Sequence, residues 1–490
     1  MVTKHFKTLS KDMFAYGVMG MVSRGVGVLL LPVFSRLFSV AEYGVIDIVA
    51  TFVGLISTFS LLCLPSALTR YFHDKRASIA SQYSTVISFV IVLCFIVLSI
   101  SYIFSDLIAS IISDQKSIGA YIFLGAGISC FVSLNRLPDA ILRMQKRIVA
   151  FNILNILTTV IYALGAVFLV VVMRKGLMGV FLVQLFAYAF QFTLGLILTR
   201  KLLTKSLNFR YLKDALKFCV PMFPATFVSM ANRQVNRIIV VAMLGLSGVG
   251  LFGAGAQIAS VVLLFVSIFQ LSWVPFSMEI LYHEDRNVVY KKSLQYYLGV
   301  FIIFGIMFSA LAPEVIWLIV PPEYSKAYLV IPWLVGAAVF HGAANIVNLG
   351  ASITEKTFIN TIASWTGFIV NIIISMSLIN WLGILGAAIG MFAAEIIFNV
   401  LLWRNTEKFL DIKYDRKMGV HVLFVYTVFS FLIIGTTWAL DDFYVLSLIS
   451  RLIVAVCSIS FVAKITIDEM GWLMIKKIPY FIKSKLNYSV

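Results

Sequence analysis

Three arginines stand inside long apolar stretches of the sequence. Arg24 lies in the run from Met13 to Ser35, and Arg233 and Arg237 lie in a second run from Phe218 to Met243. A guanidinium at bilayer depth costs about 3 kcal/mol or more, so such a residue normally faces a bundle interior, a wet cavity or a partner. Because guanidinium groups match the oxygens of phosphate, these positions indicate an anion-binding role.

Two interpretations of the arginines remain open at this stage. Arg233 and Arg237 are four residues apart and project from one helix face. They either snorkel or pair with carboxylates, or they line a wet cavity that receives an anionic head group. Arg24 is near the middle of its run, too deep to snorkel easily, which favours the cavity. Asn232, Asn236 and Gln257 are expected to add a polar lining to such a cavity.

Carboxylates are scarce within the apolar runs. Glu395 lies inside one, and Asp47 lies near the start of another. Each either pairs with a buried arginine or titrates in an ion- or proton-coupling step. Arg136, next to Pro138, is expected to mark the end of a span at the membrane interface.

Composition places these residues in a membrane protein. The chain has 490 residues, 61% hydrophobic and 12% charged, with mean hydropathy +0.98, which excludes a soluble or disordered chain. Fourteen apolar runs have the roughly 20 residues that a helix needs to cross a bilayer. The sequence therefore predicts an all-α polytopic membrane protein with about 14 transmembrane helices.

The basic residues indicate an orientation for that bundle. With both termini in the cytoplasm, most Lys and Arg fall in cytoplasmic segments, as the positive-inside tendency requires. The net charge of +17 therefore reflects topology, and its scatter among loops excludes a nucleic-acid-binding module.

An internal repeat divides the chain. At an offset of about 206 residues, Gly44 maps onto Gly250, and Gly176 and Gly179 map onto Gly383 and Gly386. Six spans per repeat predict two lobes in the same orientation, related by an axis along the membrane normal. The predicted parts are an N-lobe at 1–205, a C-lobe at 206–410, and two appended helices with a tail at 411–490. The first helix of each lobe carries the arginines, so repeat and charge predict one cavity between lobes.

Enzymatic chemistry finds no support in the sequence. The histidines are dispersed, no G-x-x-x-x-G-K motif occurs, and no two cysteines form a C-x-x-C pair. No catalytic residue, metal ligand or cofactor is predicted, and the chain is not expected to be an enzyme.

Several segments carry a family resemblance that spans nearly the whole chain. They are the basic N-terminus, the segment Pro32 to Gly44 (PVFSRLFSVAEYG), its echo at Gly248 to Gly250, and the Gly-x-x-Gly at 383 and 386. On these the chain resembles the polysaccharide transporters of the multidrug/oligosaccharidyl-lipid/polysaccharide flippase superfamily, the Wzx-type O-antigen flippases in particular.

The resemblance implies a bacterial inner-membrane protein of lipopolysaccharide biosynthesis. Such a protein turns undecaprenyl-diphosphate-linked repeat units from the cytoplasmic to the periplasmic leaflet through an alternating-access cavity, often cationic. Arg24, Arg233 and Arg237 are the residues carried over to that cavity, whereas Glu395 matches no family motif. The implied partners are the lipid-linked oligosaccharide and membrane lipids, with a polysaccharide polymerase and chain-length proteins as further candidates.

Three other functions remain as alternatives. A lipid II flippase shares the fourteen helices and cavity arginines. A cation-coupled multidrug exporter should have an acidic cavity, which the arginines oppose. A membrane polysaccharide polymerase or ligase should have a large periplasmic loop, and no predicted outer loop is long enough.

Overall fold

The computed structural model describes residues 25–72, 78–112, 118–280, 286–348, 358–410, 412, 414–440 and 443–466, and within them every regular element is helical. Twelve of these helices are long and apolar enough to cross a membrane, judged by length and composition. The prediction of an all-α polytopic membrane protein is confirmed, whereas the count of fourteen spans stays a prediction.

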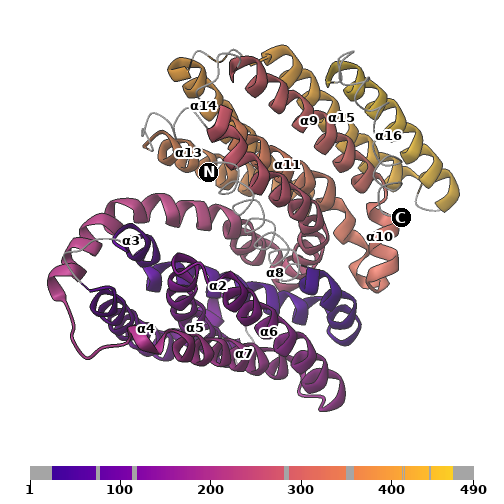
Figure 1. Cartoon of the computed structure of the whole chain (residues 1–490). Helices are drawn as coiled ribbons and strands as arrows, with labels where there is room; N and C mark the ends of the chain where they lie inside the picture. The colour runs from indigo at the N-terminus through magenta and orange to yellow at the C-terminus, as the bar shows by residue number, and fades with distance from the viewer. Residues whose placement is uncertain are drawn as a thin grey trace, which may run out of the picture.

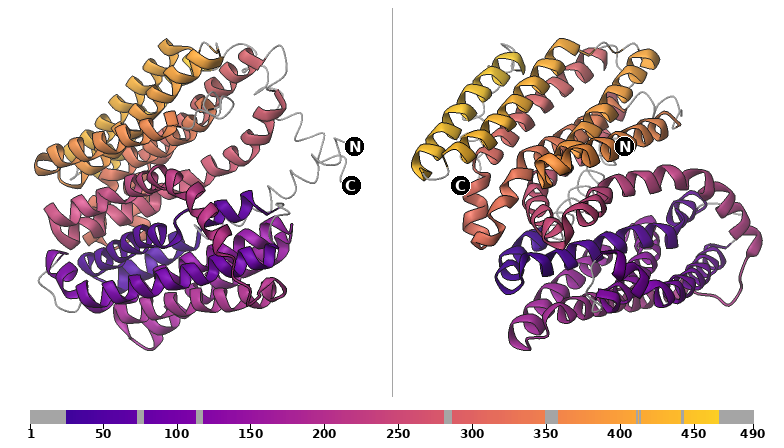
Figure 2. Two further views of the ribbon diagram at one scale, coloured as in Figure 1. Left: turned by 90° about the vertical axis from the view of Figure 1, so that its left-hand side faces the viewer. Right: turned by 180° about the vertical axis from the view of Figure 1, so that it is seen from behind.

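The helices gather into two bundles with α8 between them (Figures 1 and 2). The first bundle follows a short helix at Gly25–Leu37 and consists of α2 (Val40–Leu61), α3 (Leu64–Arg70), α4 (Ile79–Ile112), α5 (Ile118–Met144), α6 (Ile148–Val167) and α7 (Gly176–Thr199). The second consists of α9 (Arg286–Ala310), α10 (Ala312–Ile319), the 3₁₀ segment η3 (Pro322–Val330), α11 (Ile331–Val347), α13 (Phe358–Leu382), α14 (Ile384–Leu410), α15 (Arg416–Ala439) and α16 (Tyr444–Thr466). The predicted lobe boundaries stay a prediction.

Helix α8 (Phe209–Ile280) is two helices joined at a sharp bend. Gly245 has φ 71° and ψ −171°, outside the helical region, so the chain forms one helix over 209–244 and another over 246–280. The bend falls shortly before Gly250, which the sequence repeat maps onto Gly44. The first of the two helices carries Arg233 and Arg237.

Repeat-related glycines meet where α2 crosses α8. A Cβ placed on Gly44 would lie 2.0 Å from the carbonyl oxygen of Leu246, and a Cβ on Gly250 would lie 2.0 Å from the carbonyl oxygen of Val40. The two contacts are equivalent under the repeat, because the offset that maps Gly44 onto Gly250 also maps Val40 onto Leu246. The glycines let the backbones approach in the way that small residues allow in membrane helix packing.

Two further repeat-related glycines each lie in the tight turn between two successive helices. Gly176 at the start of α7 has φ 57°, and Gly383 between α13 and α14 has φ 58°. This left-handed conformation is costly for residues with a Cβ. The matching backbone geometry gives a structural basis for the Gly-x-x-Gly repeat.

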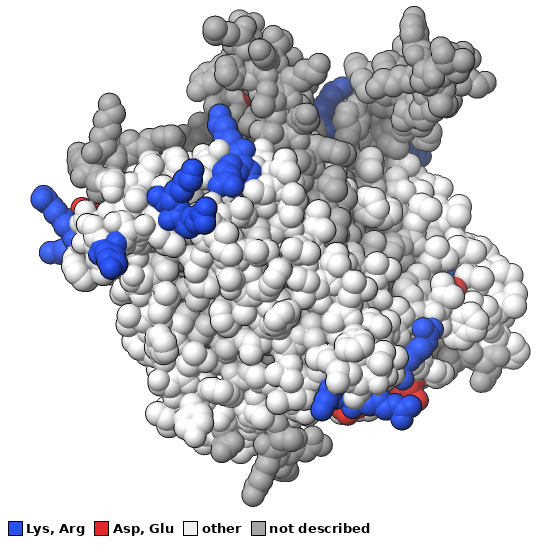
Figure 3. Space-filling view, turned by 60° about the horizontal axis from the view of Figure 1, so that its bottom comes forward, with Lys and Arg blue, Asp and Glu red and all other residues white. Residues whose placement is uncertain are grey.

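The surface is consistent with a bilayer around the bundle. On the face in Figure 3, Lys and Arg gather near two ends of the molecule and leave a broad uncharged surface between them. Large apolar side chains such as Phe95, Ile103 and Leu164 are exposed, as expected where lipid rather than water is the neighbour.

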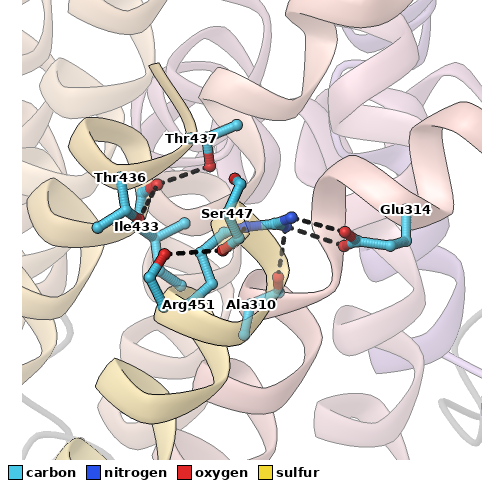
Figure 4. Close-up of polar contacts among 8 residues, drawn as sticks. Ala310, Glu314, Ile433, Thr436, Thr437, Ser447 and Arg451 are labelled. Atoms are coloured by element: carbon cyan, nitrogen blue, oxygen red, sulfur yellow. Dashed lines mark hydrogen bonds and ion pairs between the residues drawn. The ribbon is translucent and has the colours of Figure 1, made fainter. Parts of the chain in front are cut away.

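A largely buried ion pair within the second bundle joins α16 to α10 (Figure 4). The Arg451 side chain on α16 is 1% exposed and forms two contacts with the Glu314 carboxylate, at 2.9 and 2.6 Å. It also donates to the Ala310 and Ser447 carbonyls. Arg451 lies in a candidate membrane span, and its charge is matched by Glu314 on α10.

We expect Arg451→Met to lower the free energy of unfolding by about 3 kcal/mol, because it leaves the Glu314 carboxylate without its partner. Arg416→Met is the control: Arg416 pairs with Glu407, but its side chain is 72% exposed, and an exposed pair in water contributes little to stability. Thermal unfolding in detergent measures both. Equal midpoints for the two variants would contradict a special role for the Arg451 pair.

The helix crossing makes a separate prediction. Gly44→Ala should reduce stability by about 1 to 3 kcal/mol, because the added methyl group forces the two backbones apart. The control is Gly435→Ala on α15, where a Cβ would meet nothing within 4 Å and alanine favours the helix. Unfolding midpoints that do not differ between the two variants would show that the crossing is not closely packed.

Candidate functional site

The predicted site residues that the structure describes lie on three helices. Asp47 is on α2, Glu395 is on α14, and α8 carries Asn232, Arg233, Asn236, Arg237 and Gln257. Arg24 lies outside the described residues, immediately before Gly25.

Arg237 on the first half of α8 forms an ion pair with Asp47 on α2. Its Nε lies 2.6 Å from Asp47 Oδ2, with 20% of the arginine and 17% of the aspartate side chain exposed. The guanidinium also lies 5.9 Å from the Phe252 ring centroid. Gly253 leaves room for the carboxylate, since a Cβ there would lie 2.6 Å from Asp47 Oδ2. The charge of Arg237 is therefore matched locally.

The ion pair belongs to a polar seam between α2 and the first half of α8. One turn from Asp47, the Thr51 hydroxyl donates to Gln234 Oε1 at 3.3 Å. Near the far end of α2, the Cys63 thiol lies 3.3 Å from the Thr226 hydroxyl. The residue numbers rise along α2 as they fall along α8, so the helices run antiparallel along this seam.

Arg233 differs from Arg237 in having no carboxylate beside it. Its side chain is exposed, and no Asp or Glu of the described residues lies within ion-pair distance. Its backbone carbonyl accepts from Arg237 Nη1 at 3.3 Å, which couples the two positions. Arg233 is thus a charge in an apolar run with accessible surface, and no carboxylate of the described residues neutralises it.

A histidine and a glutamate face the same region. His341 Nδ1 on α11 lies 3.3 Å from Glu395 Oε2 on α14, and α11 packs against α8, the helix that carries Arg233. The His341 side chain is 42% exposed, although nearly all of α11 around it is buried. Asn399 donates to the Phe340 and Glu395 carbonyls, which fixes α14 against α11.

The sequence did not identify His341 as a site residue. The five histidines are dispersed along the chain, and His341 and Glu395 are 54 positions apart, too far for a helical spacing rule. The available signal was a single imidazole inside the apolar run of α11, which alone names no partner.

Asn232 and Asn236 take part in a hydrogen-bond network between helices. Asn371 Nδ2 donates to Asn232 Oδ1 at 2.9 Å, and Asn236 Nδ2 donates to the Ala387 carbonyl at 3.1 Å. Ser375 Oγ lies between them, 3.1 Å from Asn371 Oδ1 and 3.4 Å from Asn236 Oδ1. In this conformation these amides hold α8 to α13 and α14, and Asn236 is only 1% exposed.

Two other polar residues lie against the first helix or the first bundle. Gln257 packs on the helix at Gly25–Leu37, where a Cβ on Gly27 would lie 2.5 Å from Gln257 Nε2. Arg136 lines a polar cavity next to α5. Across the described residues, no group of three or more His, Cys, Asp and Glu is placed to hold a metal ion.

Comparison with known sequences gives a family match. A family model described as polysaccharide biosynthesis protein matches residues 9–281. A Haemophilus influenzae protein of the Lsg locus is 25% identical over 348 residues, which cover 67% of this chain and 77% of that protein.

Comparison with solved structures shows a shared fold. The lipid II flippase MurJ in an inward closed conformation superposes with a TM-score of 0.70 at 15% identity, covering 91% of this chain and 97% of that one. The Vibrio cholerae MATE transporter VcmN superposes with a TM-score of 0.57 at 14% identity, covering 83% and 98%. At these identities the likeness concerns the fold.

The polar seam predicts an asymmetry between the two arginines of α8. Arg237→Met should lower stability by about 1 to 3 kcal/mol, because Asp47 is left unpaired in a partly buried site. Arg233→Met removes no ion pair and should leave the unfolding midpoint nearly unchanged. Adding Asp47→Asn to Arg237→Met should recover part of the loss. Equal destabilisation by both single variants would contradict the pairing.

Proposed function

Because this chain belongs to the polysaccharide biosynthesis protein family, we propose that it is a flippase for undecaprenyl-diphosphate-linked oligosaccharide repeat units. It moves them from the cytoplasmic to the periplasmic leaflet of a bacterial inner membrane, in O-antigen or related lipopolysaccharide synthesis. Such a lipid does not cross hydrocarbon unaided, since its charges and hydroxyls would lose water without replacement. The protein supplies substitute contacts in a cationic cavity between the two bundles, while the polyprenyl tail stays in the bilayer.

One observation carries this proposal: Arg233 is a cation within a membrane span that no described carboxylate neutralises. A guanidinium in that position binds a diphosphate strongly, through charge-assisted and bidentate hydrogen bonds. Arg237 has a different part, because Asp47 already matches its charge. It orders the helix that presents Arg233. Arg24 is proposed, from its sequence position, as a second cation for the same head group.

His341 and Glu395 give the site a means of release. An imidazole next to a carboxylate changes the local charge when it gains or loses a proton. A proton on the His341–Glu395 pair makes the surroundings of Arg233 more positive and favours the diphosphate, and its loss favours release. Glu395 is thus a proposed coupling group through His341, whereas Asp47 is proposed to have a structural role.

Alternating access requires the two bundles to part at the crossing of α2 and α8. By the predicted topology, Gly44 and Gly250 lie on the periplasmic side, so their close contact shuts that side. Separation there and approach of the bundles at the opposite side would expose the head group to the periplasm. A polysaccharide polymerase and chain-length proteins are proposed to receive the product.

The fold likeness favours a lipid II flippase as a second candidate, since MurJ superposes over 91% of this chain. Both substrates share a polyprenyl diphosphate, so the proposed phosphate contacts are common to both. The MATE likeness gives less support to a multidrug exporter, because the unmatched charge on α8 is cationic. The names of these solved structures agree with a transporter rather than an enzyme.

Replacing Arg233 by Ala should reduce surface polysaccharide about tenfold or more in cells that depend on this protein, since a charge-assisted contact contributes about 1.5 to 3 kcal/mol. Arg233→Lys should retain part of the activity, because it keeps the charge but not the fork of donors. The readout is polysaccharide on the cell surface, with protein in the membrane measured in parallel.

Arg416→Ala is the matched control, because it removes an exposed arginine far along the chain from α8. It should leave polysaccharide export unchanged. Normal export by a well-expressed Arg233→Ala variant would overturn the proposed role of Arg233. The second candidate would be favoured if this protein restored growth to cells that lack their lipid II flippase but did not restore surface polysaccharide to cells that lack this protein.

A further inference from the structure

A polar cavity lies inside the first bundle, apart from the seam that holds Arg233 and Arg237. Its volume is about 360 Å³, and its walls come from α5, α6, α7 and the helix at Gly25–Leu37. The side chains that matter for the argument are Asn135, Arg136, Asp139, Asn155, Gln184 and Gln191. Membrane helices of one bundle pack mainly with apolar and small residues, so an amide-rich hollow of this size is unusual and has room for a small polar ligand.

One wall of the cavity carries a polar atom that lacks a partner. Asn135 is 4% exposed, and its Nδ2 donates to the Tyr188 carbonyl at 3.0 Å. Its Oδ1 is buried and has no hydrogen-bond partner among the residues that the structure describes. A buried acceptor without a partner is unfavourable. Because Asn135 is part of the cavity wall, a hydroxyl group of a bound guest would supply the missing donor.

The charges of the lining select against ions. Arg136 and Asp139 both lie in the wall, on adjacent turns of α5. Arg136 opposes a metal or other cation, and the Asp139 carboxylate opposes a free anion. An apolar guest would leave the amide groups of the lining without hydrogen-bond partners, which is unfavourable. An uncharged guest with many hydroxyl groups satisfies the whole lining.

The amides and tyrosines of the wall match a sugar. A carboxamide both donates and accepts, as does each sugar hydroxyl, so Asn155, Gln184 and Gln191 can serve neighbouring hydroxyls. Tyr162 and Tyr188 add aromatic surface that suits the apolar face of a pyranose ring. The volume is at the lower end for small-molecule sites, which fits a short saccharide rather than a polyprenyl chain.

We propose that this cavity binds sugar residues of the transported lipid, while Arg233 holds the diphosphate. This rests on the proposed function and extends it, because it divides recognition of the substrate between two places. The phosphate contacts accept any polyprenyl diphosphate. The cavity in the first bundle recognises the glycan, and its amide side chains determine which repeat unit is transported.

The test compares two lipids on the purified full chain in nanodiscs. One probe is undecaprenyl diphosphate, and the other is the repeat-unit-bearing lipid extracted from cells of the source strain that lack this protein. Asn155→Leu and Gln184→Leu should weaken binding of the sugar-bearing lipid about tenfold, from the loss of one to two hydrogen bonds. The affinity of these variants for undecaprenyl diphosphate should stay within about twofold of the unaltered protein, whereas Arg233→Ala should lower the affinity for both lipids equally.

Asn405→Leu is a closely matched control. Asn155 donates to the Phe151 carbonyl at 2.8 Å and Asn405 to the Leu401 carbonyl at 2.7 Å, each four residues back on its own helix, and both are half-buried. The control should bind both lipids normally.

Three results would overturn the assignment of the cavity while leaving the flippase intact. The first is normal binding of the sugar-bearing lipid by Asn155→Leu and Gln184→Leu. The second is an equal loss of affinity for both lipids in these variants. The third is binding of both lipids that depends on sodium concentration and is lost in these variants, which would assign the cavity to a cation. Failure of the unaltered protein to bind either lipid would instead overturn the proposed function itself.

Discussion

A charged side chain at bilayer depth needs either an opposite charge or water, and this requirement organises the molecule. Arg451 meets it through Glu314, and the last helix is held against α10 as a result. Arg237 meets it through Asp47, and α2 is held against α8. Arg233 is the exception among the three, because no described carboxylate lies beside it. The proposed function follows from that difference: the charge left over is the one available to a substrate.

The same helices that present the charge also form the contact between the bundles. Arg233 and Arg237 precede the bend at Gly245, and Gly250 follows it on the second half of α8. The crossing at Gly44 and Gly250 is symmetric under the internal repeat, with each glycine against the carbonyl of the other helix. Motion of the bundles about this crossing would therefore alter the surroundings of Arg233 directly.

Much of the fold follows from composition and periodicity. Apolar runs of helical length predict the membrane helices, and the glycines at 44, 250, 176 and 383 predict a repeat whose members share contacts or backbone angles in the structure. These features are local in sequence or recur at one spacing. Predicting these features does not require knowing which helices are neighbours.

The partners of the polar residues could not be predicted in the same way. Asp47 and Arg237 are 190 positions apart, and Asn232 and Asn371 are 139 apart, so only the packing of distant helices brings them together. The sequence indicates the depth of Arg136 in the membrane but not the direction of its side chain, which lines the cavity of the first bundle. The cavity of the first bundle is likewise built from helices whose polar faces are separately unremarkable.

The central claim is that position 233 faces water and receives a diphosphate. It is tested most directly by placing cysteine at 233 in a chain whose five native cysteines are replaced, and labelling it in membranes with a water-soluble thiol reagent. The account predicts that the thiol reacts and that undecaprenyl diphosphate slows the reaction. A thiol that reacts only with a lipid-soluble reagent, or one whose labelling the lipid does not change, would contradict it.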